Sequence, residues 1–248
     1  LGTNTLAREA FDYGVQRFIL VSSDKAVRPI GVMGATKRLA EMIIADLARE
    51  SSHTVFATVR FGNVLGSSGS VIPRFREQIL RGGPVTLTDP EITRYFMTAQ
   101  EATRLVLWAG TMAQGGEIFV LDMGKPVLIA DLARQVIEAS GYSVRDAEHP
   151  DGDIEVLVTG LRPGEKLHEE LSISGELRET GHQKLFCSVE ENLSNFELQR
   201  ALQALRKAVA LGDGARAARD AIYWSQRDLA PRTPELADSG TDFGRRRP

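Results

Sequence analysis

Phe18-Ile-Leu-Val-Ser-Ser-Asp-Lys25, followed after a short turn by Gly31-Val-Met-Gly-Ala-Thr-Lys37, is the stretch on which both the fold and the chemistry depend. The run from Phe18 to Val21 is continuously apolar, as in a strand covered on both faces, and it stops abruptly at four polar residues. In an open α/β sheet, ligands bind beyond the carboxyl ends of the strands. We therefore expect the polar residues from Ser22 to Lys25 at the place where a substrate binds.

The helix that follows brings two further residues toward this place. Its pattern begins after the turn-prone residues 28–31, and Met33 and Lys37 are four positions apart within it. Residues at this spacing lie on one face of a helix, one turn apart. The sequence therefore predicts that both side chains share one helix face behind the strand.

Helices and strands alternate on both sides of this stretch. A helix over 3–13 precedes the strand at 17–22, and a helix over 33–51 precedes a strand at 55–61. An alternation of this kind favours a parallel sheet with helices packed against it. The sequence therefore predicts an α/β fold.

The pattern continues with shorter elements. After a flexible loop at 62–69 we expect helices at 71–81, from 98 onward and at 129–139, with strands at 85–87, 95–97, 118–121 and 154–158. Residues 161–171 predict a tight turn and then a short helix. Ser194 and Glu197 have the spacing of a capping box, which predicts the start of a further helix.

Composition excludes several classes of protein. With 248 residues, 42% of them hydrophobic, the chain can bury a sizeable core as one large or two small domains. A net charge of −3 gives no electrostatic footprint for nucleic acid, and no window approaches the roughly 18 apolar residues of a membrane span. The single cysteine, Cys187, excludes an internal disulfide framework, and the scattered histidines give no metal-ligand spacing.

Six ordered motifs over residues 1–190 resemble one branch of the extended short-chain dehydrogenases. This branch is the CapD-type polysaccharide biosynthesis family of UDP-N-acetylglucosamine 4,6-dehydratases, and the spacing of Met33 and Lys37 matches its Y-x-x-x-K position. The motifs are Val21-Ser-Ser-Asp-Lys-Ala-Val-Arg-Pro29, Met33-Gly-Ala-Thr-Lys-Arg38, Arg60-Phe-Gly-Asn-Val-Leu-Gly66, Gly69-Ser-Val-Ile-Pro73, Thr93-Arg-Tyr-Phe-Met97 and Gly160-Leu-Arg-Pro-Gly-Glu-Lys166.

The resemblance implies an NAD-binding Rossmann-like fold that lacks its N-terminal strands, plus a smaller α/β substrate-binding part. Residues 1–80 would be the C-terminal half of the cofactor domain, 81–190 mainly the nucleotide-sugar part, and 191–227 C-terminal helices; 228–248 are expected to form a disordered tail. The family's G-x-G-x-x-G fingerprint is absent from the sequence, so we expect the C-terminal part of a longer enzyme. Further expectations are NAD rather than NADP, no metal, a homo-oligomer, and a cytoplasmic setting or the cytoplasmic face of a membrane-anchored parent.

The family's reaction implies roles for the opening stretch. A hydride passes from C4 of the sugar to NAD, the ketone acidifies C5, water leaves from C6, and the hydride returns to C6. By resemblance, Lys25 removes the C5 proton, Asp24 protonates the departing hydroxyl, and Ser23 contacts the C4 oxygen. The alternatives are a salt-bridged Asp24–Lys25 pair at a strand end, and a Ser23 hydroxyl that only satisfies backbone groups.

Met33 stands where most relatives in the superfamily have a tyrosine that takes the C4 hydroxyl proton. A thioether has no ionisable proton and is only a weak acceptor. Members of the CapD-type branch also carry methionine here, so the resemblance passes this proton to water or to Asp24, while Lys37 holds the cofactor ribose. Ser22 and Phe61 are expected on the same cofactor side. Simple packing on a helix face is the alternative for Met33.

Asn63, Arg94 and Arg162 resemble the family's diphosphate binders, and Glu165 is expected near a ribose. Arginine suits a diphosphate because its planar fork can make paired hydrogen bonds to phosphate oxygens. A plain surface turn is the alternative for 162–165, because proline and glycine favour turns.

The whole pattern implies conversion of UDP-N-acetylglucosamine to a UDP-2-acetamido-2,6-dideoxy-4-hexulose, in polysaccharide or glycan biosynthesis. A UDP-sugar 4-epimerase and a non-catalytic nucleotide-sugar-binding module are the alternatives. For the 248-residue chain alone, we expect no tight NAD binding and little or no turnover.

Overall fold

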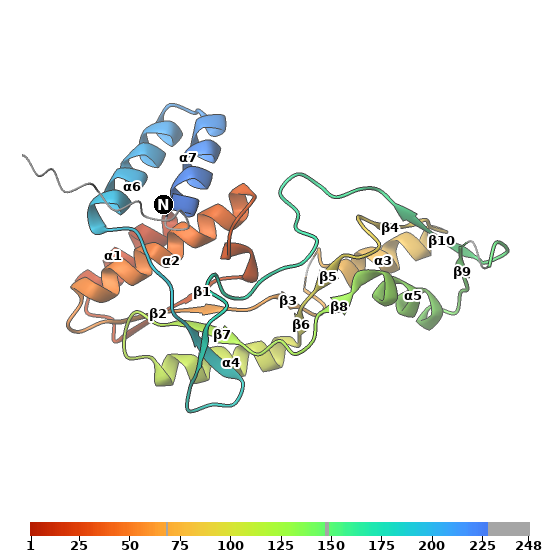
Figure 1. The fold of residues 1–248 in the computed structure, drawn as a ribbon, viewed down its shortest axis with the longest axis horizontal. Coiled ribbons are helices and arrows are strands. Elements are labelled where there is room, and N and C mark those ends of the chain that lie inside the picture. Colours follow the sequence, from red (N-terminus) through yellow and green to blue (C-terminus); the bar gives the residue numbers. More distant parts are fainter. Residues whose placement is uncertain (68, 147–148, 228–248) are drawn as a thin grey trace, which may run out of the picture.

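A five-stranded sheet forms the centre of the larger of two lobes in the computed structural model, which describes residues 1–67, 69–146 and 149–227 (Figure 1). The first three strands in the sheet order are parallel, and the last two run antiparallel to their neighbours. In spatial order the strands are β1 (Arg17–Val21), β2 (Val55–Arg60), β7 (Ile118–Leu121), β12 (Leu185–Ser188) and β11 (Leu177–Glu179). The predicted α/β fold with parallel strands is confirmed.

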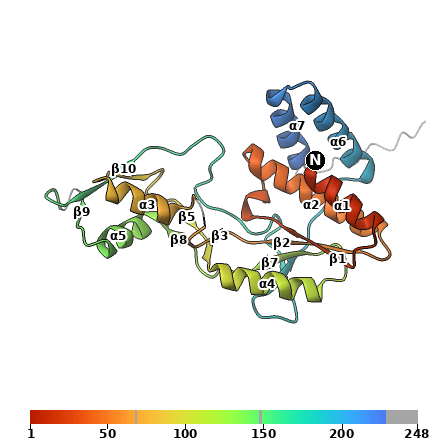
Figure 2. The same cartoon turned by 180° about the vertical axis from the view of Figure 1, so that it is seen from behind.

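Helices cover both faces of this sheet. Figures 1 and 2 show α1 (Gly2–Asp12) and α2 (Val32–Glu50) on one face and α4 (Ala99–Met112) on the other. A hairpin of α6 (Asn195–Ala210) and α7 (Gly214–Gln226) packs on the outer side of α2. As a result α2 is buried along most of its length, with residues such as Leu39, Ile43 and Leu47 in one core with Leu198 and Trp224.

The smaller lobe is built from short elements around its own apolar core. A three-stranded parallel sheet carries two helices that pack on each other. The strands are β4 (Val85–Leu87), β10 (Ile154–Val158) and β9 (Val144–Arg145), and the helices are α3 (Val71–Leu80) and α5 (Ile129–Ala139). Its core contains Phe75, Ile79 and Ile137.

Two short strand pairs join the lobes beside the carboxyl ends of β1 and β2 (Figure 1). They are β3 (Asn63–Val64) with β6 (Phe96–Met97), and β5 (Thr93–Arg94) with β8 (Val127–Leu128). The chain passes between the lobes several times, so neither lobe is one continuous stretch of sequence. As domain boundaries, 1–80, 81–190 and 191–227 stay predictions, and the tail expected at 228–248 lies outside the described residues.

Most predicted elements are present, and the capping box at Ser194 and Glu197 is formed. The short helix expected within 161–171 is wrong: this segment is a turn followed by bends. Its backbone groups bind other elements instead, since the carbonyl of Leu167 accepts from the backbone N–H of Thr93 at 3.1 Å. Strands β11 and β12 were not predicted, because three or four residues are too short to show a clear alternation. Within the described ranges, no helix is both long and apolar enough to cross a membrane.

Candidate active site

The loop after β1 gathers three polar side chains into one cluster. Ser23 caps the short 3-10 helix η1 (Asp24–Ala26), where its hydroxyl oxygen accepts from the backbone N–H of Lys25. The carboxylate of Asp24 is fully buried, and its Oδ1 accepts from Ser23 Oγ at 2.8 Å and from Lys25 Nζ at 3.0 Å. A backbone bond from Asp24 N–H to the carbonyl of Phe61, 3.1 Å long, ties this loop to the end of β2. The cluster is therefore held by two neighbouring strand ends.

A second carboxylate reaches the same lysine. Glu169 Oε1 lies 3.5 Å from Lys25 Nζ, and the Glu169 side chain is only 4% exposed. Among the described residues, Glu169 Oε2 and Asp24 Oδ2 are buried without a hydrogen-bond partner. Sequence reasoning missed Glu169; its only signal is a position three residues beyond the Gly160–Lys166 motif.

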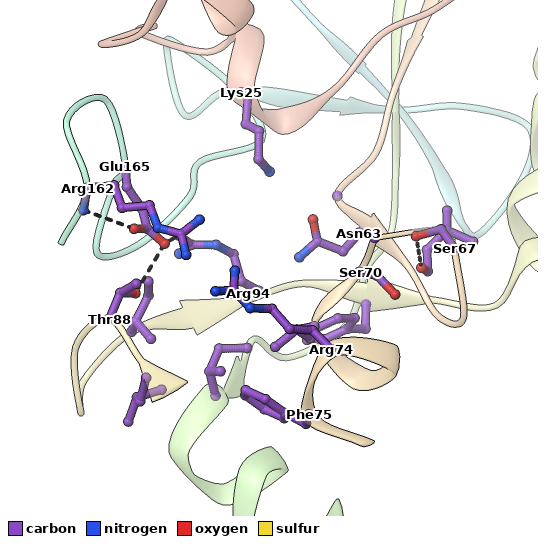
Figure 3. A pocket seen from close by; sticks show the side chains of 18 of the residues that line it. Lys25, Asn63, Ser67, Ser70, Arg74, Phe75, Thr88, Arg94, Arg162 and Glu165 are labelled. Atoms are coloured by element: carbon purple, nitrogen blue, oxygen red, sulfur yellow. Dashed lines mark hydrogen bonds and ion pairs between the residues drawn. The ribbon is translucent and has the colours of Figure 1, made fainter. Parts of the chain in front are cut away.

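A cavity of about 720 Å³ opens between the lobes beside this cluster. In Figure 3, Lys25 points into it from the large lobe, and Asn63 points in from β3. Three arginines converge from the small lobe and its connections: Arg74 on α3, Arg94 on β5 and Arg162 in the segment after β10. The cavity thus has a lysine–carboxylate cluster at one side and a cationic group facing it.

The structure brings together six of the residues predicted for the site. The cavity is lined by Lys25, Met33, Asn63, Arg94, Arg162 and Glu165. Sequence reasoning missed Arg74 and Thr88, which also line it, because nothing in their local pattern shows that they face inward.

Arg94 is the most firmly held of the three arginines. It is 9% exposed; its Nη1 donates to the carbonyls of Thr93 at 2.7 Å and Leu167 at 3.1 Å, and its Nη2 lies 3.4 Å from Glu165 Oε1. Glu165 also accepts from the hydroxyl of Thr88 at 3.2 Å. Arg74 and Arg162 are exposed, so their guanidinium groups are free to meet a ligand that enters the cavity.

A smaller cavity of about 320 Å³ shares several lining residues with the first, among them Lys25, Met33, Arg94 and Arg162. Glu169 lines this smaller cavity, together with the turn at 162–166. Met33 borders both cavities and is 54% exposed, so it is not a core residue. The turn lies tightly on the start of α2, because a Cβ on Gly31 would stand 3.3 Å from the carbonyl oxygen of Gly164.

Five other predicted residues are absent from the described lining of either cavity. They are Ser22, Ser23, Asp24, Lys37 and Phe61. Lys37 Nζ donates to the carbonyl of Val21 at 3.2 Å, at the carboxyl end of β1. One of its three N–H donors is used there, so the others fit a ribose at this sheet edge. The Ser22 hydroxyl donates to Glu41 at 2.6 Å, so its role beside a cofactor stays a prediction.

A buried network of ion pairs is connected to the loop after β1 through the hydrogen bond from Ser22 to Glu41. Arg60 at the end of β2 binds Glu41 of α2 at 2.7 Å and Glu190 beyond β12 at 2.8 Å, and Arg38 binds Glu190 at 2.9 Å. Burial opposes the ionised form of Glu190, but the hydrogen bonds and charge of Arg60 and the charge of Arg38 outweigh it and lower the pKa of Glu190 from 4.5 to about 2. Burial likewise opposes the charge of Arg60, yet the two glutamates raise the pKa of Arg60 above its ordinary value.

Residues 1–190 match the sequence family described as polysaccharide biosynthesis protein. The chain belongs to this family. It is 49% identical over 217 residues to the capsular polysaccharide biosynthesis protein CapD of Staphylococcus aureus, an alignment that covers 82% of this chain and 35% of that protein. It is 36% identical over 179 residues to a UDP-glucose 4-epimerase of Rickettsia rickettsii, covering 71% of this chain and 49% of that protein. The chain thus spans about a third to a half of the length of these relatives.

Solved structures show the same fold. Pen from Bacillus thuringiensis superposes with a TM-score of 0.66 at 33% identity, over 82% of this chain and 66% of that one. DesIV, a dTDP-glucose 4,6-dehydratase from Streptomyces venezuelae with NAD bound, superposes with a TM-score of 0.57 at 21% identity, over 68% of this chain and 55% of that one. The fold is therefore that of the extended short-chain dehydrogenases.

Proposed function

We propose that this chain forms the catalytic and nucleotide-sugar-binding part of an NAD-dependent UDP-N-acetylglucosamine 4,6-dehydratase that acts in polysaccharide or glycan biosynthesis. One observation carries the proposal: Lys25, paired with the buried Asp24, points into a cavity that three arginines enter from the facing side (Figure 3). A base and an acid beside a diphosphate-sized cationic cluster are what dehydration of a nucleotide sugar requires.

The arginine cluster would hold the diphosphate. Arg74 and Arg162 are exposed to the cavity, while Arg94 is anchored by backbone carbonyls and presents a fixed positive charge. Asn63 points into the same space and can donate to a phosphate oxygen (Figure 3). A diphosphate bound here would place the attached sugar toward Lys25, because Lys25 and the arginines line one continuous cavity.

NAD, when bound, supplies the hydride chemistry: a hydride leaves C4 of the sugar and later returns at C6. The residues of this chain that would hold it are Lys37, at the nicotinamide ribose, with Ser22 and Phe61 nearby. The DesIV structure from Streptomyces venezuelae, which has the same fold, contains bound NAD and supports this choice of cofactor.

Asp24 and Lys25 would move the protons. Lys25 takes the C5 proton, and Asp24 donates a proton to the departing C6 hydroxyl, which leaves as water. Met33 has no ionisable proton, so the C4 hydroxyl proton passes to Asp24, directly or through water. A proton that Asp24 gains at C4 and loses at C6 restores its starting state, so no outside proton is needed.

The test is to incubate the intact protein, in a form that binds NAD, with UDP-N-acetylglucosamine and NAD. Mass spectrometry should find a product lighter by one water. No such product from a protein that binds both ligands would refute the proposal.

A 4-epimerase is the second candidate, because the Rickettsia rickettsii relative bears that name. An epimerase needs no C5 base, so Lys25→Ala should leave its activity intact. A dehydratase should instead lose about 100-fold or more in kcat with the same variant. The absence of any turnover together with tight UDP-sugar binding would point to a non-catalytic module.

A further inference from the structure

Lys25 Nζ lies within ion-pair distance of two carboxylates. Asp24 Oδ1 is 3.0 Å away and Glu169 Oε1 is 3.5 Å away. Both acidic side chains are buried, whereas Lys25 is 29% exposed and faces the cavities. Lys25 is therefore the accessible member of a cluster whose two carboxylates are buried.

This arrangement opposes the role of Lys25 as a base. Lys25 forms ion pairs with both carboxylates, and an ammonium group has no lone pair with which to take a proton. The cationic side chains of Arg94, Arg162 and Lys166 also line the smaller cavity. A proton must leave Nζ before Lys25 can attack C5–H.

We propose that Glu169 accepts this proton. The inference rests on the proposed dehydratase function and adds a residue to it. One N–H bond of Lys25 breaks and one O–H bond forms on Glu169, so an ammonium and a carboxylate become an amine and a carboxylic acid with no change in total charge. The amine then takes the C5 proton as the C–H bond breaks, and returns it to C5 after reduction at C6.

Two observations favour Glu169 over Asp24 as the acceptor. Asp24 Oδ1 already accepts from Ser23 Oγ at 2.8 Å, and Asp24 has the C6 hydroxyl as its own partner in the reaction. Glu169 lines the smaller cavity, whose described lining does not include Asp24. Glu169 Oε2, like Asp24 Oδ2, has no hydrogen-bond partner within the described part of the chain, so it can take a proton. When substrate fills the site and excludes water, a neutral pair costs less to bury than an ion pair.

Glu169 is thus a positioning residue that acts through Lys25. In the intact protein, Glu169→Gln keeps the shape of the side chain but cannot take the proton. We expect kcat to fall about 100-fold while KM for UDP-N-acetylglucosamine changes less than about twofold. The kinetic isotope effect of deuterium at C5 should grow, because C5 deprotonation becomes the slow step. Glu169→Asp should restore part of the rate.

The control is Glu170→Gln, because Glu170 is the adjacent glutamate but pairs with Arg28 on the surface. It should leave kcat and the isotope effect unchanged. The double variant Lys25→Ala/Glu169→Gln should be no slower than Lys25→Ala, since both changes disable one step. A purely structural role would instead give a higher KM, additive losses and an unchanged isotope effect, which would overturn the proposal.

A second measurement does not depend on turnover. Acetic anhydride labelling of the 248-residue chain, read by mass spectrometry, compares Lys25 with Lys37 as an internal reference. Glu169→Gln should speed acetylation of Lys25 several-fold, because one of the two carboxylates that hold its proton is gone. An unchanged rate of acetylation would refute the interaction between Glu169 and Lys25. If acetylation is faster but the intact protein has no dehydratase activity, the proposed function is refuted while this interaction is supported.

Discussion

At the scale of single residues, Met33 and Lys25 line the same cavity but differ in their chemistry. Lys25 carries the charge, and Met33 is exposed beside it without an ionisable group. If Met33 only shapes the site, its thioether can be replaced by an aliphatic side chain of similar volume.

We therefore expect Met33→Leu to keep kcat within about threefold of the natural chain, because volume-conserving apolar substitutions are well tolerated. Steady-state rates of the intact protein, with Lys25→Ala as the inactive reference, would measure this. A loss as large as that of Lys25→Ala would show that the sulfur takes part in the chemistry.

Arg162 offers the clearest test of the diphosphate site, because it is exposed and its removal should not unfold the chain. Arg162→Met should weaken UDP binding to this chain about tenfold or more, since a hydrogen bond to a charged group contributes about 1.5–3 kcal/mol. Isothermal titration calorimetry measures the effect. Arg76→Met, an exposed arginine outside the cavity lining, should bind as the natural chain does; equal affinities for all three would contradict the assignment.

Much of this site could be predicted from the sequence, because the order of the motifs along the chain shows which residues follow the ends of neighbouring strands. Asn63, Arg94 and Arg162 do share a cavity with Lys25. Glu169 and Arg74 could not be found in the same way. The chain has many charged residues, and only the path of the backbone decides which of them face inward.

At the scale of elements, buried ion pairs hold the end of β2 in place. The network of Arg38, Glu41, Arg60 and Glu190 connects α2, β2 and the segment after β12. The contacts of Glu190 could not be read from the sequence, because Glu190 is 130 positions from Arg60.

This network predicts a pH dependence of stability. Since the pKa of Glu190 falls from 4.5 to about 2 on folding, its contribution is complete above about pH 4.5 and is lost as the pH falls toward 2. The shift corresponds to about 3 kcal/mol. Glu190→Gln should therefore lower the free energy of unfolding by about 3–5 kcal/mol at pH 7, because two buried arginines each lose one of their carboxylate partners.

Urea denaturation at several pH values would measure the difference between the variant and the natural chain. That difference should shrink as the pH is lowered from 4.5 toward 2. Glu179→Gln, at an exposed position of β11, is the control and should change stability by less than about 0.5 kcal/mol. A difference that does not vary with pH would show that Glu190 acts by packing alone.

The segment at 161–171 shows where local pattern fails at this scale. Its sequence allows a short helix, but Lys166 Nζ donates to the carbonyl of Val27 at 2.8 Å and Leu167 is paired with β5. Contacts across the cavity outweigh a weak helical preference. The same contacts place Glu169 beside Lys25.

At the scale of the whole molecule, the two lobes enclose the cavity in which we propose that a nucleotide sugar binds, and the described residues supply only part of the proposed cofactor site. In the described residues β1 is hydrogen-bonded on one side, to β2, and the sequence contains no G-x-G-x-x-G. The order of helices and strands could be predicted, but not how the lobes face each other, because long-range contacts decide that.

We therefore expect this chain to bind UDP but not to bind NAD tightly. Fluorescence titration of the 248-residue chain with each ligand tests both statements in one preparation. Saturable, tight NAD binding would show that the pyrophosphate of the cofactor is held by residues of this chain that no motif reveals.

In the proposed dehydratase reaction, a hydride passes from C4 to C6 of the sugar while water leaves. The most direct measurement uses UDP-N-acetylglucosamine with deuterium at C4, incubated with the intact protein and NAD, and locates the label in the product by NMR. We expect a product that has lost one water and carries deuterium at C6. Deuterium that remains at C4, in a product of unchanged mass, would contradict it.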